Sequence, residues 1–354
     1  MSPRRRKRLD PSLFALPVEK MRQGDYSDES ATRSRDVLRA TGRSPRVTLQ
    51  ISSVCAGLLG GIDESIAILK QCADDWSKLT VHAMYDGDRL HPWETVMTID
   101  GGYDGFAHLE NLFLGVLSRR TRVGTNTRAL VEAARHKSII FFPGRHDHWL
   151  VQQGDGYAAH IAGALRVTTD AQAAWGGSVG LATVPHGLVA ALGGDTAEAA
   201  RAFARHLGEE VKILALVDFT NDSVRTSLEV ARALEGRLWG VRLGTSPYLV
   251  DRSILPQMGA FDPTGVNPQL VWAVRNALDA EGFGDVKVAA SGGFTVERIR
   301  AFEDDGVPVD AYCVGASIFD GRYPFVADIV AVDGEPRIRA GREARANPRL
   351  ERVK

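Results

Sequence analysis

The chain has 354 residues, of which 44% are hydrophobic and 25% charged, and its formal net charge is −1. This composition is typical of globular proteins, and the near-zero net charge excludes a whole-molecule field that would attract nucleic acid or an anionic membrane. No apolar stretch approaches the roughly 18 residues that a membrane-spanning helix needs, and the basic start "MSPRRRKR" lacks the apolar segment of a signal peptide. We therefore predict a soluble, cytoplasmic enzyme.

Residues 1–19 are expected to form a disordered basic tail, and residues 20–137 an α+β domain. In that domain, alternating apolar residues predict strands and a 3.6-residue apolar period predicts helices. The strands are expected at 46–53 and 94–101, and the helices at 63–76 and 121–136. From about residue 325 the pattern alternates again around an Asp-Gly turn signal, so residues 325–354 are expected to join the amino-terminal sheet.

Residues 138–324 predict an α/β barrel, because short apolar runs alternate there with amphipathic helices. Seven strands are expected, at 138–142, 164–169, 180–184, 212–217, 238–243, 286–291 and 311–317. Helices between them are expected at 196–208, 224–236, 267–282 and 295–306. Seven such units favour a closed or nearly closed barrel over an open doubly wound sheet. The G-x-G-x-x-G pattern of dinucleotide-binding domains is absent.

The three cysteines, Cys55, Cys72 and Cys313, are odd in number and widely spaced. This arrangement suits neither a disulfide framework nor a zinc ribbon. Reduced thiols are therefore expected.

Polar residues follow every predicted barrel strand, at the end where parallel α/β barrels carry their functional groups. In strand order they are Arg145, His146, Asp147 and His148; Thr169 and Asp170; Thr183 and His186; Asp218, Asn221 and Asp222; Arg242, Thr245 and Ser246; Ser291, Gly292 and Gly293; and Gly315, Ala316 and Ser317. One such residue alone is more often a helix cap than a catalyst. Seven strand ends that all carry such groups indicate an active site.

The glycine turns after the last two strands predict a phosphate site. Glycine lets the backbone adopt positive φ and approach a ligand closely, and the helix that follows points its free N–H groups at the same place. Residues 291–293 and 315–317 are expected to form one phosphate cup. Arg145 and Arg242 could bind further anions through bidentate contacts.

The remaining charged groups leave two interpretations open. Asp218 and Asp222 could hold sugar hydroxyls or a Mg²⁺ ion bound to a diphosphate. A zinc hydrolase is a weaker alternative, built on a set of four residues: His146, Asp147, His148 and His186.

Seven segments closely resemble the nicotinate phosphoribosyltransferases, which are type II phosphoribosyltransferases. They are residues 94–134, 141–149 ("FFPGRHDHW"), 180–196, 215–222 ("ALVDFTND"), 263–282, 290–317 and 327–343. The resemblance runs in order from about residue 20 to 350. It implies an irregular, incomplete α/β barrel plus an α/β sandwich domain formed by both termini, and a homodimer or a multiple of dimers.

The resemblance also implies an activity and its participants. Nicotinate would react with phosphoribosyl pyrophosphate to give nicotinate mononucleotide and pyrophosphate, with Mg²⁺ as cofactor and with ATP hydrolysis coupled in many members. The catalytic residues would be His186, which family members phosphorylate from ATP, Asp218 near the ribose and Mg²⁺, and Arg242 at the phosphoribosyl donor. The substrate-binding residues would be Tyr26, Arg145 at the nicotinate carboxylate, Thr183, Thr245, and the cup formed by Ser291, Gly292, Gly293, Gly315, Ala316 and Ser317. Asp222 would assist at the metal.

Two departures from the family pattern leave the acceptor and the activity open. Gly244 stands where the family has an acidic residue that touches the ribose, so a slow enzyme is expected, and Gly244→Asp is expected to be faster. After Tyr26 and Asp28 the family's aromatic pair is missing. Two alternatives therefore remain: transfer to nicotinamide or quinolinate, and a weakened paralogue that binds phosphoribosyl ligands without turnover.

Overall fold

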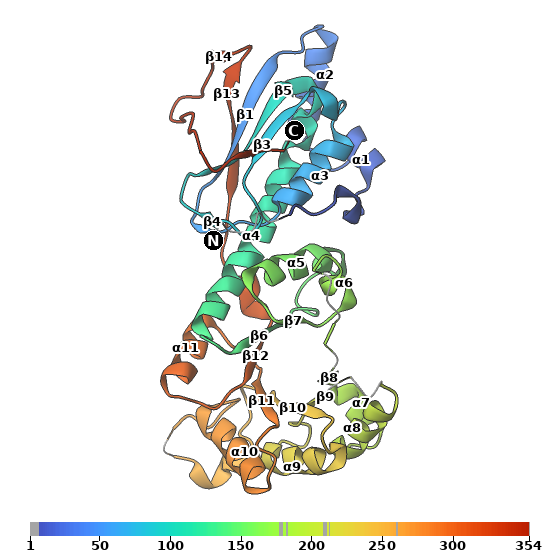
Figure 1. Ribbon diagram of the computed structural model, residues 1–354, viewed down its shortest axis with the longest axis vertical. Helices are drawn as coiled ribbons and strands as arrows, with labels where there is room; N and C mark the ends of the chain where they lie inside the picture. Colours follow the sequence, from blue (N-terminus) through green and yellow to red (C-terminus); the bar gives the residue numbers. More distant parts are fainter. Residues whose placement is uncertain are drawn as a thin grey trace. The chain divides into compact units, whose positions relative to one another are not determined.

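The computed structural model describes residues 7–176, 180–181, 183–207, 211, 213–259 and 261–353. The chain forms two compact units (Figure 1). Unit 1 comprises residues 1–125 and 319–354, and unit 2 comprises residues 126–318. The predicted boundaries, 137/138 and 324/325, lie 12 and 6 residues further along the chain. The first boundary differs because it falls inside one continuous helix, α4 (Glu110–Ala133).

Unit 1 contains a six-stranded antiparallel sheet in the order β14-β13-β1-β5-β3-β15 (Figure 1). The strands are β1 (Arg46–Ser53), β3 (Thr80–Ala83), β5 (Thr95–Gly102), β13 (Phe325–Val332), β14 (Glu335–Pro336) and β15 (Glu351–Arg352). Asp333 and Gly334 both have positive φ and form the two-residue turn between β13 and β14, as hairpin twist requires. The return of the carboxyl-terminal segment to the amino-terminal sheet is confirmed.

The apolar face of this sheet is buried by α3 (Ile62–Cys72) and the first part of α4. The helix α1 (Val18–Gln23) packs on α3, and α2 (Glu29–Ala40) packs on two short 3-10 helices, η3 (Tyr103–Gly105) and η4 (Ala107–Leu109). A separate two-stranded sheet is formed by β2 (Gly57–Leu58) and β4 (Arg89–Leu90). In α3, Ile62, Ile66 and Leu69 recur at helical spacing and are buried in one core with Leu49 and Ile51 of β1. The predicted α/β sandwich formed by both termini is confirmed.

The predicted disordered tail is corrected for residues 7–19. The Arg8 guanidinium forms an ion pair with Asp63, donates to the carbonyl oxygens of Ala83 and Met84, and stacks 4.0 Å from the centre of the Tyr85 ring. These contacts order the segment because they satisfy a buried carboxylate and two carbonyl groups at once. Residues 1–6, which carry three of the tail's arginines, lie outside the described residues.

His108 is a buried histidine in unit 1 with an unusual environment. It is 1% exposed, and neither ring nitrogen has a hydrogen-bond partner among the described residues. Burial, reinforced by the nearby charge of Arg35, lowers the pKa of His108 from 6.5 to about 4. The folded protein therefore holds this imidazole neutral over a range in which the unfolded chain protonates it.

We expect this histidine to reduce stability in mild acid. Because the folded pKa lies below the unfolded value, stability is fully present above pH 6.5 and is lost as pH falls toward 4, by on the order of 2–3 kcal/mol. Urea unfolding at pH 7 and pH 4.5 measures the loss, which should shrink in His108→Leu but not in a control, His91→Leu, at an exposed position. An equal loss in wild type and His108→Leu would contradict the assignment.

Unit 2 contains a seven-stranded, wholly parallel sheet in the order β7-β6-β12-β11-β10-β9-β8 (Figure 1). The strands are β6 (Ser138–Phe141), β7 (Arg166–Val167), β8 (Thr183–Val184), β9 (Ile213–Leu216), β10 (Leu238–Leu243), β11 (Lys287–Ala290) and β12 (Ala311–Val314). All seven predicted strands are present: β10 has the predicted bounds and the other six are shorter, and residues 182 and 212 of the prediction lie outside the described residues. The sheet curls but leaves β7 and β8 as edges, so the predicted incomplete barrel is confirmed.

Helices follow the strands of unit 2. They are α5 (Gln152–Ala162), α6 (Asp170–Ala173), α7 (His186–Ala191), α8 (Thr196–Arg205), α9 (Ser223–Leu234), α10 (Pro268–Ala280) and α11 (Val296–Asp304). Asp195, Asp222, Asn267 and Thr295 cap α8 to α11 by accepting a backbone N–H of the first turn, which fixes where each helix begins. No helix among the described residues is long and apolar enough to cross a membrane.

All three cysteines are free. Cys313, in β12, is 4% exposed, and burial raises the pKa of its thiol to about 12. Such a thiol is a buried apolar group and a poor nucleophile.

Candidate active site

The strand-end rim of unit 2, meaning the residues that directly follow β6 to β12, gathers most of the predicted site. Because the seven strands are parallel and adjacent, their carboxyl ends lie along one edge of the sheet. The rim therefore brings together groups that are up to 170 residues apart in sequence (about 145 to 317).

His186 and Asp218 form a direct pair on this rim. His186 begins α7 after β8, and its Nε2 lies 2.7 Å from Oδ1 of Asp218, which follows β9. The Asp218 side chain is 7% exposed, whereas that of His186 is 47% exposed and packs edge-on against Phe219. Since a carboxylate only accepts, Nε2 carries the proton, and Nδ1 of the neutral ring keeps its lone pair.

Arg242 supplies a cation that the described residues leave without a hydrogen bond. Its Nε is buried without a partner, and its guanidinium lies 4.6 Å from the centre of the Phe142 ring. Burial lowers the pKa of Arg242, while the nearby charge of Asp218 opposes that shift. A half-buried guanidinium that is held by an aromatic face and has unused donors is suited to bind an anion.

The turn after β11 has the conformation that its sequence predicts. Gly292 and Gly293 have φ values of 94° and 77°, a region that other residues rarely adopt. Ser291 is buried and donates its Oγ–H to the carbonyl oxygen of Leu243 at 2.7 Å. Thr295 then caps α11, so free N–H groups of the first helical turn face the same turn.

The turn after β12 lies against this first turn, because Ser317 Oγ donates to the carbonyl oxygen of Phe294 at 2.9 Å. Ala316 begins a short 3-10 helix (η7, Ala316–Phe319). A Cβ at Gly315 would come within 2.7 Å of the His146 ring, so this glycine is required by packing. The two turns therefore adjoin, as predicted.

Gly244 is packed on three sides, and this argues against the faster Gly244→Asp enzyme that the family pattern led us to expect. A Cβ at Gly244 would lie 3.1 Å from Leu216 Cδ1, 3.2 Å from Ser291 Oγ and 3.3 Å from Asp218 Oδ2. The Asp218 carboxylate already occupies the space beside residue 244. A second carboxylate at that position would meet crowding and like-charge repulsion.

We therefore predict that Gly244→Asp lowers activity. The cost of overpacking and repulsion is about 1–3 kcal/mol, which corresponds to a fall in kcat/KM of roughly tenfold or more. Gly244→Ala should show a smaller loss, because it adds only the Cβ. Steady-state kinetics on both variants tests the point, and a faster Gly244→Asp enzyme would contradict it.

Two predicted ligands have structural roles. Asp222 caps α9 and forms an ion pair with Arg225, and Thr245 is 2% exposed and donates to Asp251 at 3.5 Å.

The zinc alternative finds no support among the described residues, because no cluster of three or more His, Cys, Asp or Glu side chains there could hold a metal ion. His148, one of the four residues of that alternative, instead caps the short helix η5 (Trp149–Val151) with its Nδ1.

The other predicted substrate-binding residues are exposed or partly exposed. Arg145 follows β6 and is exposed, and Thr183 lies in β8, partly exposed. Tyr26 is 49% exposed in unit 1, where its carbonyl oxygen accepts from Asn111. Residues 29–31, the segment that lacks the family's aromatic pair, form the first turn of α2.

Comparison with known proteins identifies relatives of this architecture. Residues 36–121 match the family model "Quinolinate phosphoribosyl transferase, N-terminal domain". The nicotinate-nucleotide pyrophosphorylase from Pyrococcus furiosus is similar over 93% of this chain and 80% of its own, with 27% identity and a TM-score of 0.78. The resemblance to the type II phosphoribosyltransferases is confirmed.

More distant solved structures share the type II phosphoribosyltransferase fold. NadC from Streptococcus pyogenes is 15% identical, with a TM-score of 0.61 over 90% of this chain and 99% of its own. Human nicotinic acid phosphoribosyltransferase is 15% identical, with a TM-score of 0.63 over 88% of this chain and 75% of its own. No curated protein sequence matches the chain.

Sequence reasoning missed three residues that organise this site. Phe142 supports Arg242, Phe219 packs on His186, and Asp251 binds the loops that follow β9 and β10. Phe142 directly follows β6 and Phe219 comes one residue after Asp218, so their place at strand ends was a usable signal. No such signal marked Asp251, because it lies eight residues beyond the end of β10.

Proposed function

We propose that this protein is a phosphoribosyltransferase that transfers the ribose 5-phosphate group of phosphoribosyl pyrophosphate to a pyridine carboxylic acid, with nicotinate as the acceptor. The observation that carries the proposal is the Arg242 guanidinium, which has unused donors beside the His186–Asp218 pair and on the same rim as the two glycine turns. The matches to phosphoribosyltransferases support the reaction class.

The proposed reaction exchanges one bond for another at ribose C1. The bond from C1 to the pyrophosphate oxygen breaks as the pyridine nitrogen bonds to C1, and pyrophosphate leaves with the electron pair. The protein must neutralise the leaving group and align the acceptor more than it must supply a base. Arg242 would neutralise the departing diphosphate, and the cup around Gly292 and Gly293 would hold the 5′-phosphate through backbone N–H groups.

A Mg²⁺ ion bound to the diphosphate would supply further charge neutralisation, since such ions are held by one or two carboxylates plus substrate phosphates. Asp218 fits this role, because its Oδ2 makes no hydrogen bond with a described residue while Oδ1 binds His186. Asp222 fits it less well, since it caps α9 and pairs with Arg225.

A specific observation favours quinolinate as a second candidate acceptor. The matching family model over residues 36–121 is that of a quinolinate phosphoribosyl transferase. Quinolinate carries two carboxylates and requires more cationic groups at the pyridine end than nicotinate does. Arg145 and its neighbour His146 are the groups on the rim after β6 that could meet this need.

An acceptor panel tests the proposal. Purified protein with phosphoribosyl pyrophosphate and Mg²⁺ should form a mononucleotide from nicotinate with at least tenfold higher kcat/KM than from nicotinamide or quinolinate. Arg145→Ala should remove most of the preference for nicotinate over nicotinamide, whereas Arg201→Ala, on the exposed face of α8, should not. A preference for quinolinate would support the second candidate, and no transfer to any acceptor would contradict both.

We further propose that ATP hydrolysis is coupled through His186. The Nε2–H bond to Asp218 leaves Nδ1 as the nucleophile: it would bond to the γ-phosphorus as the bond to the β,γ-bridging oxygen breaks and ADP leaves, and water would later release the phosphoryl group as phosphate. Incubation with γ-labelled ATP should give an acid-labile, base-stable label that His186→Ala removes and that His206→Ala, a control after α8, retains. A label that survives His186→Ala would contradict the phosphohistidine.

A further inference from the structure

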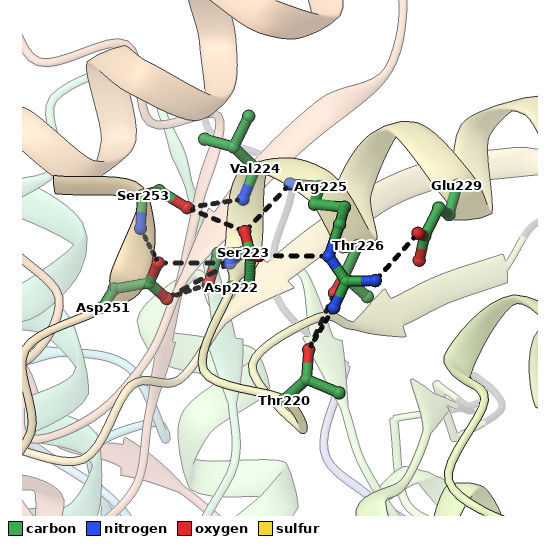
Figure 2. A network of polar contacts seen from close by, with 9 residues as sticks. All are labelled: Thr220, Asp222, Ser223, Val224, Arg225, Thr226, Glu229, Asp251 and Ser253. Carbon is green, nitrogen blue, oxygen red and sulfur yellow. Dashed lines mark hydrogen bonds and ion pairs between the residues drawn. The ribbon is translucent and has the colours of Figure 1, made fainter. Parts of the chain in front are cut away.

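Asp251 is a buried carboxylate of unit 2 that lies outside the candidate active site. It is 0% exposed and forms no ion pair with a described residue. Its oxygens accept from Ser223 Oγ at 2.6 Å, from Ser223 N at 3.2 Å and from Ser253 N at 2.9 Å, with Thr245 Oγ1 at 3.5 Å. Figure 2 shows the carboxylate directed toward Ser223 and Ser253.

These donors belong to three different segments. Thr245 follows β10, Ser223 is the first residue of α9, and Ser253 lies in the short helix η6 (Arg252–Gln257). A buried charge is costly unless hydrogen bonds satisfy it. Here the N-terminus of α9 adds its dipole to those bonds, so the carboxylate stays stable only while the three segments keep this arrangement.

Neighbouring bonds join the same two loops. Asn221 Nδ2 donates to the Val250 carbonyl oxygen at 2.7 Å, and Arg252 N donates to the Asn221 carbonyl oxygen at 2.9 Å. Ser253 Oγ accepts from Val224 N at 3.0 Å and donates to Asp222 (Figure 2). The loop after β9 and the loop after β10 thus form one clasp, with Asp251 at its buried centre.

The clasp is continuous with two residues of the strand-end rim, Asp218 and Gly244. Asp218 is the second residue of the first loop, Gly244 begins the second, and Asp218 Oδ2 lies 3.3 Å from the position of a Cβ on Gly244. A small shift between the loops would therefore change the space around the Asp218 carboxylate. A misplacement of about 1 Å is enough to lower a rate by a factor on the order of a hundred.

We propose that Asp251 is a positioning residue for phosphoribosyl transfer, which sets the loop after β10 against the start of α9 and so fixes Asp218 and Gly244 at the rim. This inference rests on the proposed function. Asp251 acts through the loops and touches no substrate itself.

The test replaces the carboxylate with its amide. In Asp251→Asn, an NH₂ group would face the N–H donors of Ser223 or Ser253, so at least one bond is lost. We expect kcat/KM for phosphoribosyl pyrophosphate to fall ten- to a hundredfold per folded enzyme, roughly the effect of a misplaced group, while KM for the pyridine acid stays within about twofold of wild type. Hydrogen exchange at the Ser223 and Ser253 amides should accelerate.

A matched control separates positioning from general stability. Glu303→Gln also converts a buried carboxylate of unit 2 to an amide, but Glu303 binds Tyr312 and Lys137 at the amino end of the strands. The Glu303→Gln substitution should lower the melting temperature with little change in kcat/KM. If Asp251→Asn does not fold, Ser223→Ala, which removes one bond, should give a smaller loss, of about threefold, in the same direction.

Three outcomes separate the claims. Faster exchange with wild-type kcat/KM in a folded Asp251→Asn, or Ser223→Ala, would contradict the positioning role. A fall in kcat/KM of the same size in Glu303→Gln would contradict it too. Wild-type protein that transfers no phosphoribosyl group would contradict the proposed function itself, whatever the variants do.

Discussion

Arg242→Gln should lower kcat/KM for phosphoribosyl pyrophosphate by about a hundredfold or more. Pyrophosphate gains charge as it leaves, and the loss of one well-placed donor to such a charge costs roughly 2.7–4 kcal/mol. Arg242 can meet this charge because its guanidinium donates to no described residue and Phe142 holds its plane. Steady-state kinetics with varied donor measures the effect.

The control for this prediction is Arg275→Gln. Arg275 is also partly buried in unit 2 with an unpartnered Nε, but its other nitrogens donate to the carbonyl oxygens of Phe283 and Val286 at the amino end of β11. The Arg275→Gln enzyme should be less stable than wild type but keep the wild-type kcat/KM. Arg242→Lys should recover only part of the activity, because lysine keeps the charge without the planar fork. Unchanged kcat/KM in folded Arg242→Gln would refute the role of this arginine.

Gly293→Val should abolish binding of the donor and of the mononucleotide product. The φ of 77° at Gly293 is strained for a β-branched residue, at a cost of roughly 1–3 kcal/mol. The valine side chain would also stand where the 5′-phosphate approaches the backbone N–H groups. Calorimetric titration with nicotinate mononucleotide should therefore detect no binding at concentrations that saturate wild type.

A second glycine with positive φ serves as the control that separates backbone strain from loss of the phosphate site. Gly306 also has positive φ, 63°, and a Cβ there would meet nothing within 4 Å. Gly306→Val should carry similar strain and keep its affinity for the mononucleotide. Wild-type affinity in Gly293→Val would remove these glycines from the phosphate site.

The parallel sheet could be predicted from sequence because its strands are apolar throughout. All four residues of β9, and likewise of β12, are buried, which requires cover on both faces and so marks a parallel α/β unit. The boundary between the units could not be predicted, since it falls inside the continuous helix α4 and no linker or turn marks it. The ion pair of Arg8 with Asp63 could not be predicted from sequence either, because it joins residues 55 positions apart.

The site was predictable where chemistry follows directly from position on the rim. His186 and Asp218 were both identified as strand-end groups, and the structure pairs them. The environment of Gly244 was not predictable, because it depends on side chains from β9 and from the turn after β11 that meet only in the folded protein. For the same reason Thr245 was expected at the ligand, whereas its hydroxyl binds Asp251.

The most direct test of the central claim is a ³¹P NMR time course of wild-type protein with phosphoribosyl pyrophosphate, nicotinate, Mg²⁺ and ATP. We expect the donor signals to be replaced by pyrophosphate and a pyridine mononucleotide in equal amounts, and Arg242→Gln should make the same products much more slowly. Wild-type protein that leaves the donor unchanged with nicotinate, nicotinamide and quinolinate alike would contradict the account.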